Sequence, residues 1–237
     1  MAKQKKTKWR AIPRKRRWAR PVRLGLALVL ALVLTPLVLT PLYIVIRPLS
    51  TLMIYERVAV GPVEHQWVRF DDISRSLVAS VIMAEDGKYC DHKGVDWVEL
   101  NKALDGLDAR PRGASTIAMQ TVKNLFLWSS RSYVRKTIEI PLALYADKIL
   151  GKRRLMEIYL NIAEFGPGLF GVEAAARHYF GRSAAKLSRR QSALLTASLP
   201  NPSARDPADP SPGLEARARA IEQQADIAGA YIVCLYP

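Results

Sequence analysis

A stretch of 23 residues without a charged side chain, Leu24–Ile46, constrains this chain more than any other feature. In a helix that rises about 1.5 Å per residue, the stretch spans roughly 34 Å, enough to cross the hydrocarbon core of a bilayer. Pro36 and Pro41 fall inside it, and membrane helices tolerate such prolines. A cleaved signal peptide is the alternative, but the run is long for a signal core and no clear small-x-small cleavage site follows it. We therefore predict one uncleaved transmembrane helix over residues 24–46.

Basic residues concentrate ahead of this stretch. Residues 1–23 hold eleven Lys and Arg and no acidic residue, although the whole chain carries +15. The 36 Lys and Arg of the chain less these eleven leave 25 against 21 Asp and Glu, a net charge of only +4. The bland alternative is a solvated tail, but the positive-inside rule favours a cytoplasmic tail and export of the chain after Ile46. The near-balanced remainder argues against a nucleic-acid partner.

The exported part is predicted to be mainly α, with a connector over 47–70, in which a short strand fits, and a domain over 71–237. An apolar face spaced by three and four residues begins at Ile73, with Asp71 and Asp72 as N-cap candidates. Strand-like alternation is not visible over any length. Further helices are predicted over Ser115–Leu127, Ser132–Leu150, Arg153–Asn161, Val172–Tyr179, Ser188–Leu199 and Leu214 to about Ile232.

Two cysteines, Cys90 and Cys234, lie far apart in the sequence. They would be able to pair in an oxidising compartment, but two such residues do not make a disulfide framework. We expect them to be unpaired.

Four motifs follow one another in the exported part. The pattern E-D-x-x-Y-x-x-H-x-G at 85–94 resembles the first motif of the peptidoglycan glycosyltransferases, the lysozyme-like family that polymerises lipid II. The segments GASTIAMQTVKN, RKTIE and RLMEIYLN, at 113–124, 135–139 and 154–161, resemble the second, third and fourth motifs. The resemblance covers about residues 70–210, and four motifs in order are far more specific than one.

The resemblance implies a lysozyme-like helical domain in the periplasm, held by one helix in the inner membrane. It implies transfer of the growing glycan from undecaprenyl pyrophosphate to the 4-hydroxyl of lipid II, with inversion. The nearest pattern is the monofunctional, membrane-anchored branch found in Gram-negative bacteria. No cofactor is required, although a divalent cation, Mg²⁺ or Mn²⁺, is compatible with the pyrophosphate. Lipid II and the glycan strand are the implied partners, together with other cell-wall synthesis and division proteins.

Two carboxylates are the catalytic candidates, Glu85 and Glu139. A sugar hydroxyl becomes nucleophilic when a carboxylate takes its proton, and packing beside Met83 and Ala84 would desolvate Glu85 and raise its pKa. The alternative for Glu85 is an exposed helix end paired with Lys88. For Glu139 the alternative is an ordinary helix salt bridge, whereas the resemblance places it on the donor side, orienting the pyrophosphate or its cationic partners.

The departing pyrophosphate needs positive charge more than a proton donor. Cationic and hydrogen-bonding residues that resemble the family's donor site make up the binding candidates, against the alternative of a solvated basic face. These are Asp86, Ser115, Thr116, Gln120, Lys123, Asn124, Arg131, Arg135 and Lys136. Ser115 or Thr116 also caps a helix whose N-terminus attracts phosphate.

Other motif residues are assigned structural roles. His92 is expected to order the turn 87–94, because the chain has only three histidines and no close pair of them. Tyr159 and Asn161 are interpreted as supports, Asn161 as a helix C-cap.

Three residues depart from the family pattern. The hydroxyl of Tyr89 needs a partner, Met119 removes a polar contact, and Pro141 is expected to kink the helix near Glu139. The family's last, arginine-centred motif is not recognisable around Arg217 and Arg219.

Two other functions remain open from the sequence. One is a glycan-cleaving enzyme on the same scaffold, such as a lysozyme or lytic transglycosylase, which has no need of cations directed at a pyrophosphate. The other is a non-catalytic scaffold of the cell-wall machinery. In the polymerising enzyme, the loop 105–112 would cover the donor lipid.

Overall fold

A computed structural model describes residues 15–104, 115–128 and 132–236 of the chain, which divides into two units, 1–39 and 40–237. Arg131 and the predicted loop 105–112 lie outside the described residues. Helix α1 (Lys15–Leu42) contains the stretch Pro21–Leu42, which is long and apolar enough to cross a membrane. A helix that could span a membrane is therefore present where one was predicted, but it ends at Leu42 rather than Ile46, and a turn follows.

The predicted connector 47–70 is part of the second unit and contains a helix that sequence reasoning missed. Helix α2 (Thr51–Ala59) begins after Ser50, whose side chain accepts a hydrogen bond from Met53 N–H at 3.0 Å. Only Met53 of this helix is buried, so no core-facing periodicity marked it in the sequence. Thr51 Oγ1 donates to the carbonyl oxygen of Leu127 at 2.8 Å and ties α2 to the rest of the domain.

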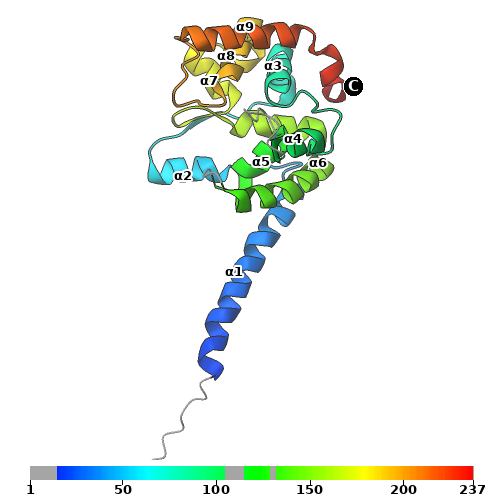
Figure 1. Ribbon diagram of the computed structural model, residues 1–237. Helices are drawn as coiled ribbons and strands as arrows, with labels where there is room; N and C mark the ends of the chain where they lie inside the picture. The colour runs from blue at the N-terminus through cyan, green and yellow to red at the C-terminus, as the bar shows by residue number, and fades with distance from the viewer. Residues whose placement is uncertain (1–14, 105–114, 129–131, 237) are drawn as a thin grey trace, which may run out of the picture. The chain divides into compact units, whose positions relative to one another are not determined.

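The second unit is mainly helical, as predicted. Helices α3 (Arg75–Glu85), α7 (Val172–Phe180), α8 (Arg189–Ser198) and α9 (Pro212–Asp226) lie together in its upper part in Figure 1, with α3 packed on α8 and α9. Helix α5 (Ile117–Phe126) packs against α6 (Tyr133–Ile162) below them, and α4 (Trp97–Leu104) follows the first motif.

Short hydroxyl side chains begin these helices. Ser74, Thr116 and Ser188 each accept a backbone N–H three residues further on, which satisfies one of the free donors of the first turn. The prediction that Asp71 or Asp72 caps α3 is wrong, because both belong to the short 3₁₀ helix η1 (Phe70–Asp72) that precedes Ser74.

Helix α6 bends where the sequence placed a break between two helices. Gly151 has φ 69° and ψ 163°, and it is the one residue inside α6 with non-helical backbone angles. Such a positive φ suits glycine because it has no Cβ. We expected the kink at Pro141, but it lies at Gly151. The C-cap of α6 is Ala163, so Asn161 is not a capping residue.

A small sheet interrupts the helices. Strands β1 (Glu64–His65), β2 (Glu164–Gly166) and β3 (Leu169–Phe170) pair in the order β1-β3-β2. Strand β1 lies in the connector 47–70, where the sequence allowed a short strand, whereas β2 and β3 were not predicted. Strand β1 runs parallel to β3, and β2 runs antiparallel to it. Strands of two or three residues are too short to show an alternation.

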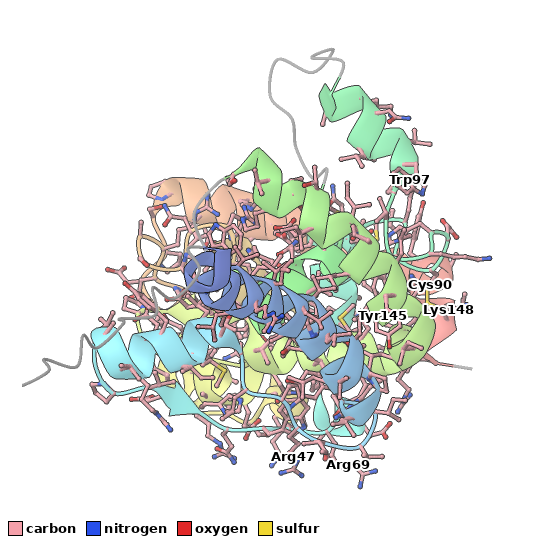
Figure 2. The ribbon with its side chains drawn as sticks, turned by 90° about the horizontal axis from the view of Figure 1, so that it is seen from below. Arg47, Arg69, Cys90, Trp97, Tyr145 and Lys148 are labelled. Carbon is pink, nitrogen blue, oxygen red and sulfur yellow. A yellow bond between two sulfur atoms is a disulfide. The ribbon has the colours of Figure 1, made fainter. Side chains whose placement is uncertain are left out.

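The C-terminal segment closes back on the first motif. The predicted last helix divides into α9 and the 3₁₀ helix η3 (Ala228–Leu235), whose Ile232 and Leu235 are buried. Cys234 forms a disulfide with Cys90, so our expectation of unpaired cysteines is wrong (Figure 2). The packing of η3 against α3 brings Cys234 close to Cys90, although the two residues are 144 positions apart in the sequence.

Candidate active site

Glu85 is the last residue of α3, and the core holds that helix firmly. Leu77, Val78, Val81 and Ile82 are completely buried, which fixes the direction in which the helix end points. Glu85 lines an open groove of about 790 Å³, formed by the end of α3, by Thr116, and by one face of α9. The apolar run of the first motif therefore ends on a carboxylate because the helix delivers it to the edge of a cleft.

The Glu85 carboxylate is oriented by a chain of hydrogen bonds. Gln120 Nε2 donates to Glu85 Oε2 at 3.0 Å, and the Tyr159 hydroxyl donates to Gln120 Oε1 at 3.1 Å. Burial raises the pKa of Glu85 above 4.5, and Gln120, Arg217 and Lys123 oppose that rise. The predicted desolvation of this carboxylate is confirmed. Lys88 is not its partner, since it pairs with Glu99 at 3.2 Å.

Asp86 joins the first motif to the second. Its Oδ1 lies 2.8 Å from His92 Nε2, and its Oδ2 accepts the backbone N–H of Ile117, in the first turn of α5, at 2.9 Å. Both oxygens of this buried carboxylate therefore have partners within the protein. The expectation that His92 orders the turn is confirmed by the same contact.

The turn after Asp86 is fastened to α5 and α6. Thr116 Oγ1 donates to the Gly94 carbonyl at 2.6 Å and accepts from Met119 N–H at 3.2 Å, which confirms Thr116 as the cap. Gly94 has φ 82°, and a Cβ there would lie 2.6 Å from the carbonyl oxygen of Ala143. The Tyr89 hydroxyl donates to the Lys152 carbonyl at 2.7 Å, so its extra polar atom has a partner.

The first turns of α6 supply two cations and the second carboxylate. Arg135 pairs with Glu139 Oε1, and Lys136 Nζ lies 3.6 Å from Oε2. Lys136 also donates to Ser115 Oγ at 2.5 Å. Glu139 is only 1% exposed. The structure thus supports the view that Glu139 orients its cationic partners, since a carboxylate buried beneath them has little surface for a ligand.

Lys123 connects the cations of α6 to Glu85. Burial lowers its pKa, repulsion from Arg135 lowers it further, and the charges of Glu85 and Glu164 oppose that change. Burial, with Arg135 and Lys123, lowers the pKa of Lys136 to about 8. Three partly buried cations that repel one another are expected to bind an anion with several oxygens favourably.

Some of the predicted site residues do not line the groove beside Glu85. Glu139 is not among the residues that line the groove beside Glu85. Asn124 is buried, with its backbone oxygen accepting from Thr51. Met119 is fully buried, with its sulfur 3.9 Å from Lys136 Nζ. Asn161 supports the site by accepting Val68 N–H at 2.8 Å and donating to Val68 O at 2.9 Å.

In the described part of the chain, no group of three His, Cys, Asp or Glu side chains is arranged to bind a metal ion. Asp86 and Glu139 already have partners within the protein. A divalent cation at the pyrophosphate therefore stays a prediction, and no step proposed below uses one.

Sequence reasoning missed two charged residues of the site. Arg217 lines the groove and interacts with the charge of Glu85. Glu164 is half-buried, and its pKa is raised by burial and by Glu56, with Lys123 opposing. Leu214, Ala218 and Ile221 form the buried face of α9, and no local pattern in the sequence placed Arg217 beside a glutamate of another helix.

Comparison with known proteins gives the family of this chain. The model of a family described as transglycosylase matches residues 53–226. A protein of Rhizobium meliloti named biosynthetic peptidoglycan transglycosylase is 53% identical over 226 residues, which cover 94% of this chain and 96% of the relative. Proteins of the same name from Brucella suis and Agrobacterium fabrum are 51% and 52% identical, over 92% and 87% of this chain and 99% and 93% of their own lengths.

Proposed function

This chain belongs to the transglycosylase family, and on that premise we propose that it polymerises lipid II into glycan strands of peptidoglycan. The observation that carries the proposal is the link between a desolvated carboxylate, Glu85, and the cations Arg135 and Lys136 through the charge of Lys123. A base and an anion site within electrostatic reach of each other are what this transfer requires.

Glu85 acts on the acceptor. Its carboxylate takes the proton of the 4-hydroxyl of lipid II while that oxygen attacks the anomeric carbon of the growing strand. The bond between this carbon and the pyrophosphate oxygen breaks, and its electron pair leaves with undecaprenyl pyrophosphate. Attack from the face opposite the leaving group inverts the anomeric carbon. The raised pKa of Glu85 makes the carboxylate a stronger base for this step.

Lys123, Arg135 and Lys136 act on the donor. They offset the negative charge that grows on the pyrophosphate as the bond breaks, which lowers the barrier because the charges are already in place. Glu139 is a positioning residue in this proposal, since it fixes Arg135 and Lys136 rather than touching substrate. Arg217 lies on the acceptor side and opposes the rise in the pKa of Glu85.

The cellular location that we propose is based on the lipid-linked substrates, the basic tail and the apolar span. We propose an inner-membrane protein with its basic tail in the cytoplasm and the chain after Ile46 in the periplasm, where the Cys90–Cys234 disulfide is stable. Exposed apolar side chains after the span, among them Leu49, Ile54 and Val58, suit a flank that lies in the membrane surface. Both substrates would then keep their lipid tails in the bilayer. Association with other cell-wall proteins stays a prediction.

The test uses the purified full chain with lipid II and, separately, with finished cell wall. Polymerisation predicts release of undecaprenyl pyrophosphate and formation of glycan strands, whereas a glycan-cleaving enzyme would solubilise muropeptides from the wall. Glu85→Gln should lower polymerisation by about 10²–10⁴-fold, the range typical for loss of a general base. Matched thermal unfolding of this variant and the wild type controls for folding. Polymerisation retained by the Glu85→Gln variant would reject Glu85 as the base. If neither the wild type nor the variant polymerises lipid II or cleaves the cell wall, the non-catalytic scaffold is the function that remains.

A further inference from the structure

A second hollow, of about 560 Å³, lies where the chain leaves its apolar span. Four arginines line it, Arg47, Arg69, Arg153 and Arg154, together with the single acidic residue Glu157. The apolar part of its wall comes from Ile44, Val45, Trp67 and Leu150. None of these residues lines the groove beside Glu85. We call this hollow the arginine groove.

Two of the four arginines build the wall. Arg154 donates to the backbone oxygens of Tyr43 at 2.7 Å and Ile46 at 2.8 Å, and it pairs with Glu157. Arg153 donates to the Leu235 carbonyl at 3.0 Å. Because Arg154 holds the carbonyls of the turn after α1, the groove has a fixed edge rather than a loose one.

The other two arginines face solvent. Arg47 and Arg69 are exposed, and Figure 2 shows them near each other at one edge of the molecule. Among the residues that the structure describes, no ion pair joins either of them to an acidic side chain. The groove therefore offers two guanidinium groups whose charge is not neutralised by the protein, and planar guanidinium groups bind phosphate oxygens in a fork.

The chain itself brings this groove to a membrane surface. Arg47 follows the end of the apolar span, Leu42, by five residues, which reach at most about 18 Å even when fully extended. Ile44 and Val45 lie between them and are 50% and 80% exposed. Trp67 has the Arg154 guanidinium 5.4 Å from its ring centroid. Tryptophan beside arginine is typical of the layer where lipid headgroups lie.

We propose that the arginine groove binds the phosphate of one anionic phospholipid. This lipid belongs to the leaflet in which the C-terminal end of the apolar span lies. Arg47 and Arg69 hold the phosphate, while Ile44 and Val45 contact the upper part of the lipid chains. A zwitterionic lipid is a poorer occupant because its own cation opposes the unpaired arginines. A free phosphate ion would leave the exposed apolar wall in water. The proposal depends on the membrane span and not on the proposed enzymatic function.

The test is native mass spectrometry of the full chain in detergent, with equal amounts of phosphatidylglycerol and phosphatidylcholine. The wild type should retain one phosphatidylglycerol in preference to phosphatidylcholine. Arg47→Gln with Arg69→Gln should weaken that retention at least about tenfold, since two charge-assisted contacts are lost. Arg182→Gln with Lys186→Gln removes the same charge from exposed residues outside the groove and should change nothing. Glu85→Gln should also bind normally.

Several results would overturn the proposal. Equal retention of the two lipids, or an unchanged affinity in the groove variant, would show that no such site exists. An equal loss in the Arg182/Lys186 control would mean that net charge alone attracts the lipid. Displacement of the bound lipid by excess inorganic phosphate would assign the groove to a free anion. Thermal unfolding of each variant separates loss of binding from loss of fold, and if the groove variant fails to fold, Arg47→Lys with Arg69→Lys takes its place.

Discussion

Gln120 holds Glu85 by donating its amide Nε2–H to Oε2 at 3.0 Å, and the hydroxyl of Tyr159 fixes which way that amide faces. A hydrogen bond to the ionised carboxylate stabilises the charged form, so this contact works against the burial that raises the pKa of Glu85. Two opposing effects, burial and the hydrogen bond from Gln120, thus set the pKa of Glu85, and each of them can be measured.

Removing the Gln120 amide should shift the pH profile. Glu85 accepts a proton only when ionised, so activity falls as the pH drops through its pKa, which already lies above 4.5. Gln120→Met removes the stabilising hydrogen bond, raises this pKa further and moves the acid limb of kcat/KM to higher pH. The check is a pH–rate profile of both proteins. Arg217→Gln should move the limb in the same direction, and an unmoved limb in both variants would contradict this account.

Lys136 should set an alkaline limit. Its pKa of about 8 means that it loses its charge as the pH rises through that value, which weakens binding of the anionic donor. We expect KM for lipid II to rise above pH 8 with a smaller change in kcat. Lys136→Arg serves as the matched variant because an arginine stays protonated, so its KM should be flat over the same range. A wild-type KM that is independent of pH from 7 to 9.5 would exclude Lys136 from donor binding.

Asp86 should prove structural as much as functional. Asp86→Ala leaves the N–H of Ile117 without its acceptor and removes the partner of His92, each in a buried place. The expected loss in the free energy of unfolding is about 2–4 kcal/mol, on the scale of one or two buried unsatisfied groups. Urea denaturation measures it. Full stability with lost activity would instead make Asp86 a direct ligand of the substrate, as the sequence motif first suggested.

The disulfide should stabilise the C-terminal segment. Cys90–Cys234 closes a loop between residues 144 apart, and replacing both cysteines by serine is expected to cost about 2–5 kcal/mol. Chemical denaturation with and without a reductant gives the value. The serine variant is its own control, because reductant should destabilise the wild type and leave the variant unchanged. A wild type indifferent to reductant would contradict a disulfide in the folded protein.

Local patterns predicted the elements that depend on neighbouring residues. The spacing of apolar residues marked α3, α5, α7 and α8 within a few positions, and the E-D-x-x-Y-x-x-H-x-G motif marked Glu85 and the role of His92. Helix α2 escaped because most of its apolar residues face outward and show no buried periodicity. The sequence did not separate the 3₁₀ helix η3 from α9 because only one residue, Ile227, lies between them.

By itself, the sequence determined that this chain has an apolar span, a mainly helical domain and a carboxylate at the end of a buried helix. Those features depend on the spacing of side chains along a few turns, which the order of residues records directly. Only the tertiary structure decided that Arg217 faces Glu85, that Cys90 meets Cys234, and that Asp86 accepts from the start of α5. These contacts join residues distant in sequence, and they form because the buried faces of separate helices pack in one arrangement that no local pattern contains.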